Sequence, residues 1–264
     1  APAFGAPFTT LPIDPVAFRG QSSRMEPRQR ATPLVPLPKL LTELGVPIEP
    51  VFAGTGIGPE DLRPDAFIPF AAVPVLLERA AALSGCDDLG LRLGQRQSLA
   101  SIGPAGAIMA SAATLGEALS DFVAVHISNS TATSVYLNRA GDDVAFGYGI
   151  YQSDIAPSPR LYDLVLAAGC ALLRELTRGA VRPLEVVTMR PAPKEPARWT
   201  RLAGCPVRFG QAETALVLPR AALGFPLPTA DRAAHAARKE LEAVSAAPGE
   251  SPLKAEAAEL LKKL

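Results

Sequence analysis

The stretch that decides the fold is residues 68–119, IPFAAVPVLLERAAALSGCDDLGLRLGQRQSLASIGPAGAIMASAATLGEAL. In its first part, apolar side chains recur at steps of three and four residues, from Val73 through Leu76 to Leu83, which is typical of a helix with one apolar face. Gly85 is well placed to end that helix. The pattern predicts a helix over 68–83, and a second short helix over 88–94 that packs back on it.

The end of this stretch carries a helix-start signal. Thr114 is followed three residues later by Glu117, the spacing of a capping box, in which each residue satisfies an amide of the other's turn. We therefore predict a helix from Thr114 through His126. Just before it, residues 102–111 are small and apolar, and Gly103 and Gly106 permit close backbone contact.

The pattern changes near Ser130. Residues 134–137 and 144–151 alternate apolar and polar side chains around a turn at 139–143, which predicts a β-hairpin. Residues 159–176 are typical of an amphipathic helix, and a short helix is expected around Trp199. Further strands are predicted at 184–190, 207–209 and 215–218. The chain is thus predicted to be α+β: an N-terminal helical part, then a small, mainly antiparallel sheet with flanking helices.

The two ends differ from the centre. Residues 1–36 are rich in proline and predicted to be a disordered leader, in which Met25 is either an internal residue or the biological start. Helices are expected at 231–244 and 254–264, separated by Pro248 and Gly249. We therefore divide the chain into a leader (1–36), a central domain (37–230) and a helical tail (231–264).

Composition restricts the class of partner. The 26 basic and 26 acidic residues cancel, whereas domains that bind nucleic acid usually have a basic excess, so we expect no direct nucleic-acid binding. No apolar run approaches the roughly 20 residues that cross a bilayer, and no secretory signal is evident, so we expect no membrane contact. Cys86 and Cys170 lie in apolar runs typical of buried thiols, which fits a cytoplasmic location.

The sequence offers little for catalysis. It holds two histidines, and we expect His235 to lie outside the core. No zinc motif, and no Cys/His cluster, is present. The acidic pairs at 87–88 and 142–143 fall in turns, and the glycines of 54–58 lack the spacing and the Lys-Ser/Thr of a phosphate loop. We predict no catalytic residue, no metal and no cofactor, and keep an enzyme only as the least favoured hypothesis.

A ligand pocket is easier to argue. Pockets for small molecules are mostly apolar with a few placed polar groups. His126, Tyr148, Tyr151 and Trp199 supply rings with hydrogen-bonding tips, and we name them as the candidate ligand-binding residues. Tyr148 and Tyr151 are three residues apart, so in a regular strand only one of them faces a given cavity. For Trp199 and His126, plain structural roles remain the alternative.

Several segments together resemble the N-terminal effector-sensing and dimerisation domain of AraC/XylS-type transcription regulators. They are LPKLLTELG (37–45), IPF (68–70), LGLRLG (89–94), SAATLGEAL (111–119), CPVRF (205–209), ALVLP (215–219) and FPLPTAD (225–231). The resemblance covers residues 37–231. It implies a domain that binds a small-molecule effector, that forms a homodimer, and that is not an enzyme.

The sequence departs from this family in one respect. Such regulators continue with about a hundred residues that form two helix-turn-helix units, whereas this sequence stops at Leu264. DNA binding is therefore not expected from this chain. The alternative hypothesis is a stand-alone interaction module that dimerises with full-length regulators without a ligand. A large apolar cavity favours the sensor, and a filled core with an exposed apolar helix face favours the module.

Overall fold

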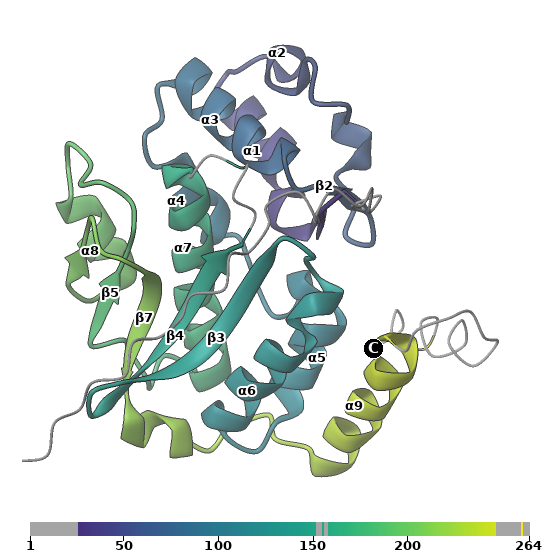
Figure 1. The fold of residues 1–264 in the computed structure, drawn as a ribbon, viewed down its shortest axis with the longest axis vertical. Coiled ribbons are helices and arrows are strands. Elements are labelled where there is room, and N and C mark those ends of the chain that lie inside the picture. Colours follow the sequence, from purple (N-terminus) through teal and green to yellow (C-terminus); the bar gives the residue numbers. More distant parts are fainter. Residues whose placement is uncertain (1–25, 152–154, 156–157, 247–259, 261–264) are drawn as a thin grey trace, which may run out of the picture.

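The computed structural model of the chain describes residues 26–151, 155, 158–246 and 260. Short helices lie at one end of the molecule and a sheet with its covering helices at the other (Figure 1). The predicted α+β class is confirmed. Residues 1–25 of the predicted leader, and the predicted helix 254–264 apart from Leu260, lie outside the described residues.

The N-terminal part begins earlier than predicted. Strand β1 (Arg28–Arg30) pairs antiparallel with β2 (Phe67–Pro69), and Leu34 in the following 3-10 turn is buried. The predicted boundary at residue 36 was wrong because a two-stranded edge and a 3-10 turn tolerate prolines that a helix does not. The other elements of this part are 3-10 turns Thr32–Leu34 and Pro59–Asp61, with helices α1 (Leu37–Glu43), α2 (Ile48–Phe52) and α3 (Ala72–Ser84).

Helix α3 starts four residues later than predicted. Ile68 lies in β2, where it faces Gln29 of β1, and the Phe70 amide donates to the Pro27 carbonyl. The backbone of residues 68–70 is therefore engaged in these pairings, and the helix begins after them. Gly85 ends α3 in the left-handed conformation, as predicted.

Helix α4 (Leu89–Gly94) packs against α7 (Pro159–Thr177), rather than mainly on α3 as predicted. Gly90 and Gly94, one turn apart, face the carbonyls of Arg160 and Leu164 so closely that a Cβ at either position would overlap them. Glycine at this spacing signals a close helix contact but does not say which helix is the partner.

Helices α5 (Pro104–Ser111) and α6 (Leu115–Val125) follow, with 3-10 turns at Ala100–Ile102 and His126–Ser128. One of the two hydrogen bonds of the predicted capping box is present, and the other is made to a neighbouring residue. The Glu117 amide donates to Thr114 Oγ1 at 3.2 Å, while the Glu117 carboxylate accepts from the amide of Ala113 rather than from that of Thr114.

The described sheet has five strands in the order β3-β4-β7-β5-β6, antiparallel except for β5 and β6. Its strands are β3 (Thr133–Ala140), β4 (Asp143–Ile150), β5 (Glu185–Val187), β6 (Val207–Arg208) and β7 (Thr214–Pro219), with α8 (Ala197–Ala203) between β5 and β6. The predicted hairpin is confirmed, with Thr133 opposite Ile150 and Ala140 opposite Asp143. Helix α7 packs on β7 behind the sheet in the view of Figure 1.

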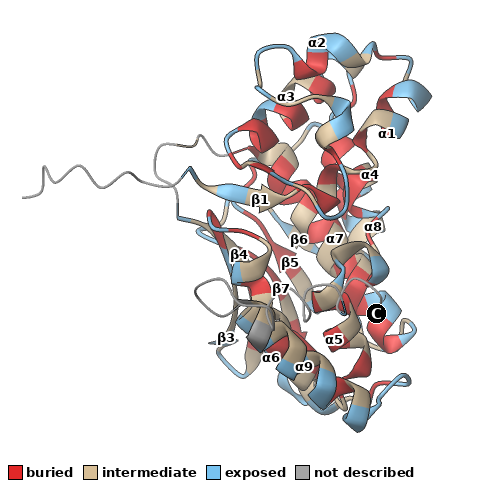
Figure 2. Cartoon of the chain, turned by 90° about the vertical axis from the view of Figure 1, so that its right-hand side faces the viewer, coloured by how far each residue is buried: buried red, intermediate tan, exposed pale blue. Residues whose placement is uncertain are grey.

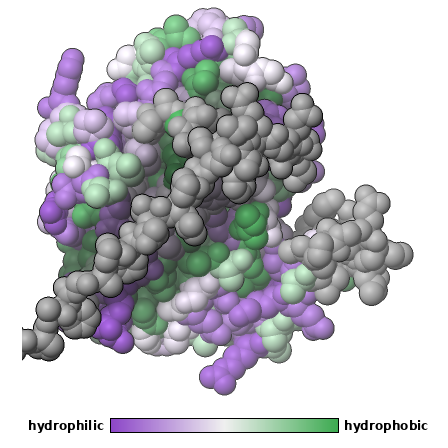
Figure 3. Space-filling model, in the orientation of Figure 1, coloured by the Kyte–Doolittle hydropathy of each residue, from purple (hydrophilic) through white to green (hydrophobic). Residues whose placement is uncertain are grey.

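The last described helix, α9 (Arg232–Ala246), follows the 3-10 turn Arg220–Gly224 and packs on α5. Ion pairs from His235 and Lys239 to Asp121 also attach α9 to α6. His235 is only 6% exposed, so the expectation that it lies outside the core was wrong. The face of α9 in Figure 3 is mainly hydrophilic, whereas hydrophobic side chains gather over the middle of that view.

Buried residues run through α3 and α7, while α2 is more exposed (Figure 2). The three cysteines are buried and free, which confirms the prediction for Cys86 and Cys170. Burial raises the pKa of Cys170 to about 12, so this thiol is unreactive at neutral pH. Among the described residues, no helix combines the length and the apolarity needed to span a membrane.

Candidate ligand-binding site

A cavity of about 150 Å³ lies where β1 and the turn after it meet α6, α7 and the inner face of the sheet. Segments distant in sequence form its wall, from Gln29 to Leu216. The lining residues are Gln29, Arg30, Thr32, Pro33, Leu34, Phe70, Val73, Gln97, Ile102, Phe122, His126, Asn129, Val135, Phe146, Gly147, Tyr148, Leu161, Leu164, Val165, Leu166, Ala168, Gly169, Leu172, Thr214, Ala215 and Leu216.

Helix α7 supplies much of the apolar wall. The residues predicted to share one face of this helix, from Leu161 through Leu164 to Leu172, line the cavity. Between them lie Ala168, with only a methyl group, and Gly169, with no side chain, and both line the cavity. The strands close the other side with Val135 and Phe146. The helix thus helps to form both the core and the space for a ligand.

The polar groups gather where β1 meets the end of α6. Arg30 Nε donates to Asn129 Oδ1 at 3.1 Å, and the Arg30 amide donates to the Asn129 carbonyl at 2.8 Å. The Asn129 amide in turn donates to the His126 carbonyl. The Arg30 guanidinium lies over the Phe67 ring at 4.8 Å from its centroid. Desolvation lowers the pKa of Arg30, against the attraction of Glu242 and Asp65.

His126 is a predicted ligand-binding residue that is buried and lines the cavity. It is 8% exposed, its Nε2 lies 3.0 Å from Thr133 Oγ1, and its ring meets Phe122 edge-on. Its Nδ1 is buried and has no hydrogen-bond partner among the described residues. Desolvation lowers the pKa of His126 to about 4, so the ring is neutral at pH 7. It offers one unused hydrogen-bonding position.

The two candidate tyrosines lie in different surroundings. Tyr148 lies in β4 and lines the cavity, while Tyr151, just past the strand, is 55% exposed and does not line it. Burial raises the pKa of Tyr148 well above its usual value, so its hydroxyl is protonated at neutral pH. A ligand contact by His126 or Tyr148 stays a prediction that this geometry permits.

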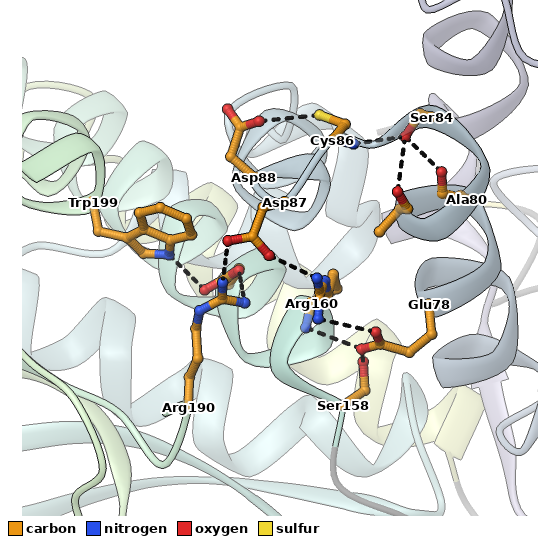
Figure 4. Close-up of polar contacts among 12 residues, drawn as sticks. Glu78, Ala80, Ser84, Cys86, Asp87, Asp88, Ser158, Arg160, Arg190 and Trp199 are labelled. Carbon is orange, nitrogen blue, oxygen red and sulfur yellow. Dashed lines mark hydrogen bonds and ion pairs between the residues drawn. The ribbon is translucent and has the colours of Figure 1, made fainter. Parts of the chain in front are cut away.

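Trp199 takes part in a different structure. It is 3% exposed and its indole Nε1–H donates to Asp163 Oδ1 at 2.7 Å (Figure 4). Arg190 lies over the indole, with its Nη1 2.8 Å from Asp163 Oδ2 and its Nη2 3.1 Å from Asp87. Arg160 continues this group of charges from Asp87 to Glu78, linking α3 to α7.

Asp163 is fully buried at the centre of this group. Burial raises its pKa to about 7, against the stabilisation of the carboxylate by Arg190 and Trp199. The group lies apart from the cavity, because none of Asp163, Arg190 and Trp199 is a lining residue. We attribute to it a structural role in joining α7 to the strand and helix that follow it.

One set of described residues has ligand atoms close enough for a metal ion: Glu117, Asp121 and His235, within 4.8 Å of one another. Other contacts already satisfy this set. His235 Nε2 lies 2.7 Å from one Asp121 oxygen, and Lys239 Nζ lies 2.6 Å from the other. We interpret the set as the ionic attachment of α9 to α6.

Sequence reasoning missed Arg30, Gln29 and Asn129. Arg30 fell inside the predicted leader, and Asn129 follows the end of a predicted helix. The apolar α7 face was visible in the sequence, but it is typical of any packed helix. Arg30 is brought to the cavity by the pairing of β1 with β2 and by its hydrogen bonds with Asn129, both of which join segments distant in sequence.

His126 gives the free energy of unfolding a pH dependence that we expect to be measurable. Its pKa is 6.5 in the unfolded chain and about 4 in the folded protein, so between these values the unfolded state binds more protons. Stability is therefore lost as the pH falls through this window, by about 2 kcal/mol between about pH 7 and pH 5. Urea unfolding at both pH values should show that His126→Gln loses about 2 kcal/mol less than wild type. An equal loss in both proteins would mean that His126 is not buried in its neutral form.

Known proteins resemble this chain in sequence and fold. It is 32% identical over 207 residues to the HTH-type transcriptional regulator VirS of Mycobacterium tuberculosis, in strains CDC 1551 / Oshkosh and ATCC 25618 / H37Rv alike. The match takes 76% of this chain and 60% of each relative, so the chain spans about 60% of their length. The crystal structure of the transcriptional regulator CdpR from Pseudomonas aeruginosa superimposes with a TM-score of 0.59 at 20% identity, over 87% of this chain and 65% of that one, which shows a shared fold.

Residues 45–227, which lie between α1 and α9, match the family described as the N-terminal arabinose-binding domain of the AraC transcription regulator. That range contains both strands of the hairpin, α7 and most of the cavity wall. The chain therefore belongs to the AraC family of bacterial transcription regulators, through their N-terminal effector-binding domain.

Proposed function

We propose that this chain senses a small-molecule effector in the cavity between β1, α6, α7 and the sheet, and that it does so as a homodimer in the cytoplasm. The observation that supports this most is the cavity itself. It has about 150 Å³ of space, a largely apolar wall and a few polar groups at one end, which is the usual composition of a small-molecule site. The cavity favours the sensor over the stand-alone interaction module, because the module hypothesis predicts a filled core.

The longer relatives are named as HTH-type, that is helix-turn-helix, transcriptional regulators. We propose that the effector binds two arrangements of the dimer with different affinity, so that its arrival shifts the population between them. The shift would reposition helix-turn-helix units in a full-length regulator. In this account the present chain provides the binding site and the dimer contact, and no step of catalysis.

The experiment is native mass spectrometry of the purified chain, followed by extraction of bound molecules under denaturing conditions. We expect a dimer, carrying either a copurified organic molecule or one selected from a metabolite library by thermal shift. Ala168→Leu fills the cavity and should abolish the binding. Ala171→Leu, on the same helix but outside the cavity lining, should leave it intact. A folded wild-type chain that binds nothing in either assay would favour the interaction module.

A further inference from the structure

We propose, as an extension of the function proposed above, that the effector is a small organic acid: a compact apolar body with a carboxylate that pairs with Arg30. Three observations lead to this class of ligand. They are the charge of the cavity lining, the unused position on His126 and the size of the apolar space.

The charge of the lining points to an anion. Arg30 is the only charged residue among the lining residues once His126 is neutral, and the described lining includes no Asp or Glu. The Arg30 guanidinium donates to the Asn129 side chain and to the Pro64 carbonyl, both uncharged oxygens. Glu242 and Asp65 attract it from outside the lining, but among the described residues neither comes within ion-pair distance of it. A guanidinium binds a carboxylate through parallel hydrogen bonds, so it provides a charge and a geometry that an acid would complete.

The buried histidine supports a bound ligand of some polarity. His126 Nδ1 is buried and has no hydrogen-bond partner in the part of the chain that the structure describes, and an unpaired polar group of this kind costs free energy. The ring is 8% exposed and lines the same cavity as Arg30. A polar atom of the ligand near Nδ1 would supply the missing hydrogen bond. Because the ring is neutral, it can either donate or accept, according to its tautomer.

The size of the cavity limits the apolar body. An apolar cavity of roughly 150 Å³ in a protein core holds one benzene molecule, and the present cavity has about that volume. The apolar part is therefore about one six-membered ring or a short branched chain.

The test compares phenylacetate with phenylacetamide, which have nearly the same shape and differ in charge. Isothermal titration calorimetry on the purified wild-type chain should show phenylacetate binding about 10- to 100-fold more tightly than the amide, the range expected for a hydrogen-bonded ion pair. Arg30→Gln should remove this preference. Arg28→Gln, on the same strand but outside the lining, should keep it. The wild-type comparison does not depend on the folding of either variant.

Equal affinity for acid and amide, or a preference that survives Arg30→Gln, would overturn the assignment of an acid. So would the failure of every carboxylate in a panel of this size to bind the wild-type chain. If a neutral molecule then bound and Ala168→Leu removed it, the proposed sensing function would stand without the acid. If no molecule bound at all, both proposals would fall.

Discussion

Asp163→Ala should lower the free energy of unfolding by about 3 kcal/mol, and the loss should be larger if the surrounding structure does not relax. The carboxylate is fully buried and accepts from Arg190 Nη1 at 2.8 Å and from the Trp199 indole at 2.7 Å. Its removal leaves the Arg190 guanidinium, which is 3% exposed, with Asp87 as its only acidic partner among the described residues. Urea denaturation should be measured at about pH 8, because the pKa of Asp163 is raised to about 7 and the carboxylate must be ionised.

Two controls separate this effect from the general cost of substitution. The double variant Asp163→Leu/Arg190→Met removes both charges, and it should recover part of the loss because no buried charge is left unpaired. Arg96→Ala removes an ion pair with Glu43 in which both side chains are at least one-third exposed, and it should cost less than about 1 kcal/mol. If Asp163→Ala were no more destabilising than Arg96→Ala, the group around Asp163 would not hold the helices together.

Gly94→Ala should destabilise the chain by about 2–3 kcal/mol, because α4 and α7 touch through their backbones. A Cβ at position 94 would lie 2.4 Å from the Leu164 carbonyl oxygen and 2.6 Å from the Ala167 Cβ. Backbone atoms cannot rotate away as a side chain can, so the two helices must separate. The free energy of unfolding in urea measures the loss.

Gly169→Ala is the matched control, since it makes the same change in a helix. Its new Cβ would meet only Leu216 Cδ1 at 3.1 Å, the flexible end of a side chain. The gain in helix propensity of up to about 1 kcal/mol offsets that contact, so a net change close to zero is expected. Similar losses for the two variants would show that the α4–α7 contact is not specially close.

Periodicity predicted the elements that depend on local sequence. The hairpin, α7 with its start at Pro159, and the end of α3 at Gly85 lie close to where the patterns place them. The misplaced features depend on partners distant in sequence. Ile68 lies in a strand because it pairs with Gln29. Helix α4 packs on α7 because its glycines allow close contact with the α7 backbone.

The candidate site shows the same division. Rings and hydrogen-bonding tips could be read from the sequence, and His126 and Tyr148 do line the cavity. Trp199 also combines a ring with a hydrogen-bonding tip, yet it is bonded to Asp163 and does not line the cavity. A single sequence carries the character of each side chain, but the cavity is formed by β1, α6, α7 and the sheet together. No local sequence pattern predicts that these elements come together.

Helix α6 touches two regions through neighbouring residues. Phe122 lines the cavity, while Asp121, the residue before it, holds His235 and Lys239 of α9. The wall of the cavity and the attachment of the last described helix therefore depend on the position of the same helix, through two adjacent residues.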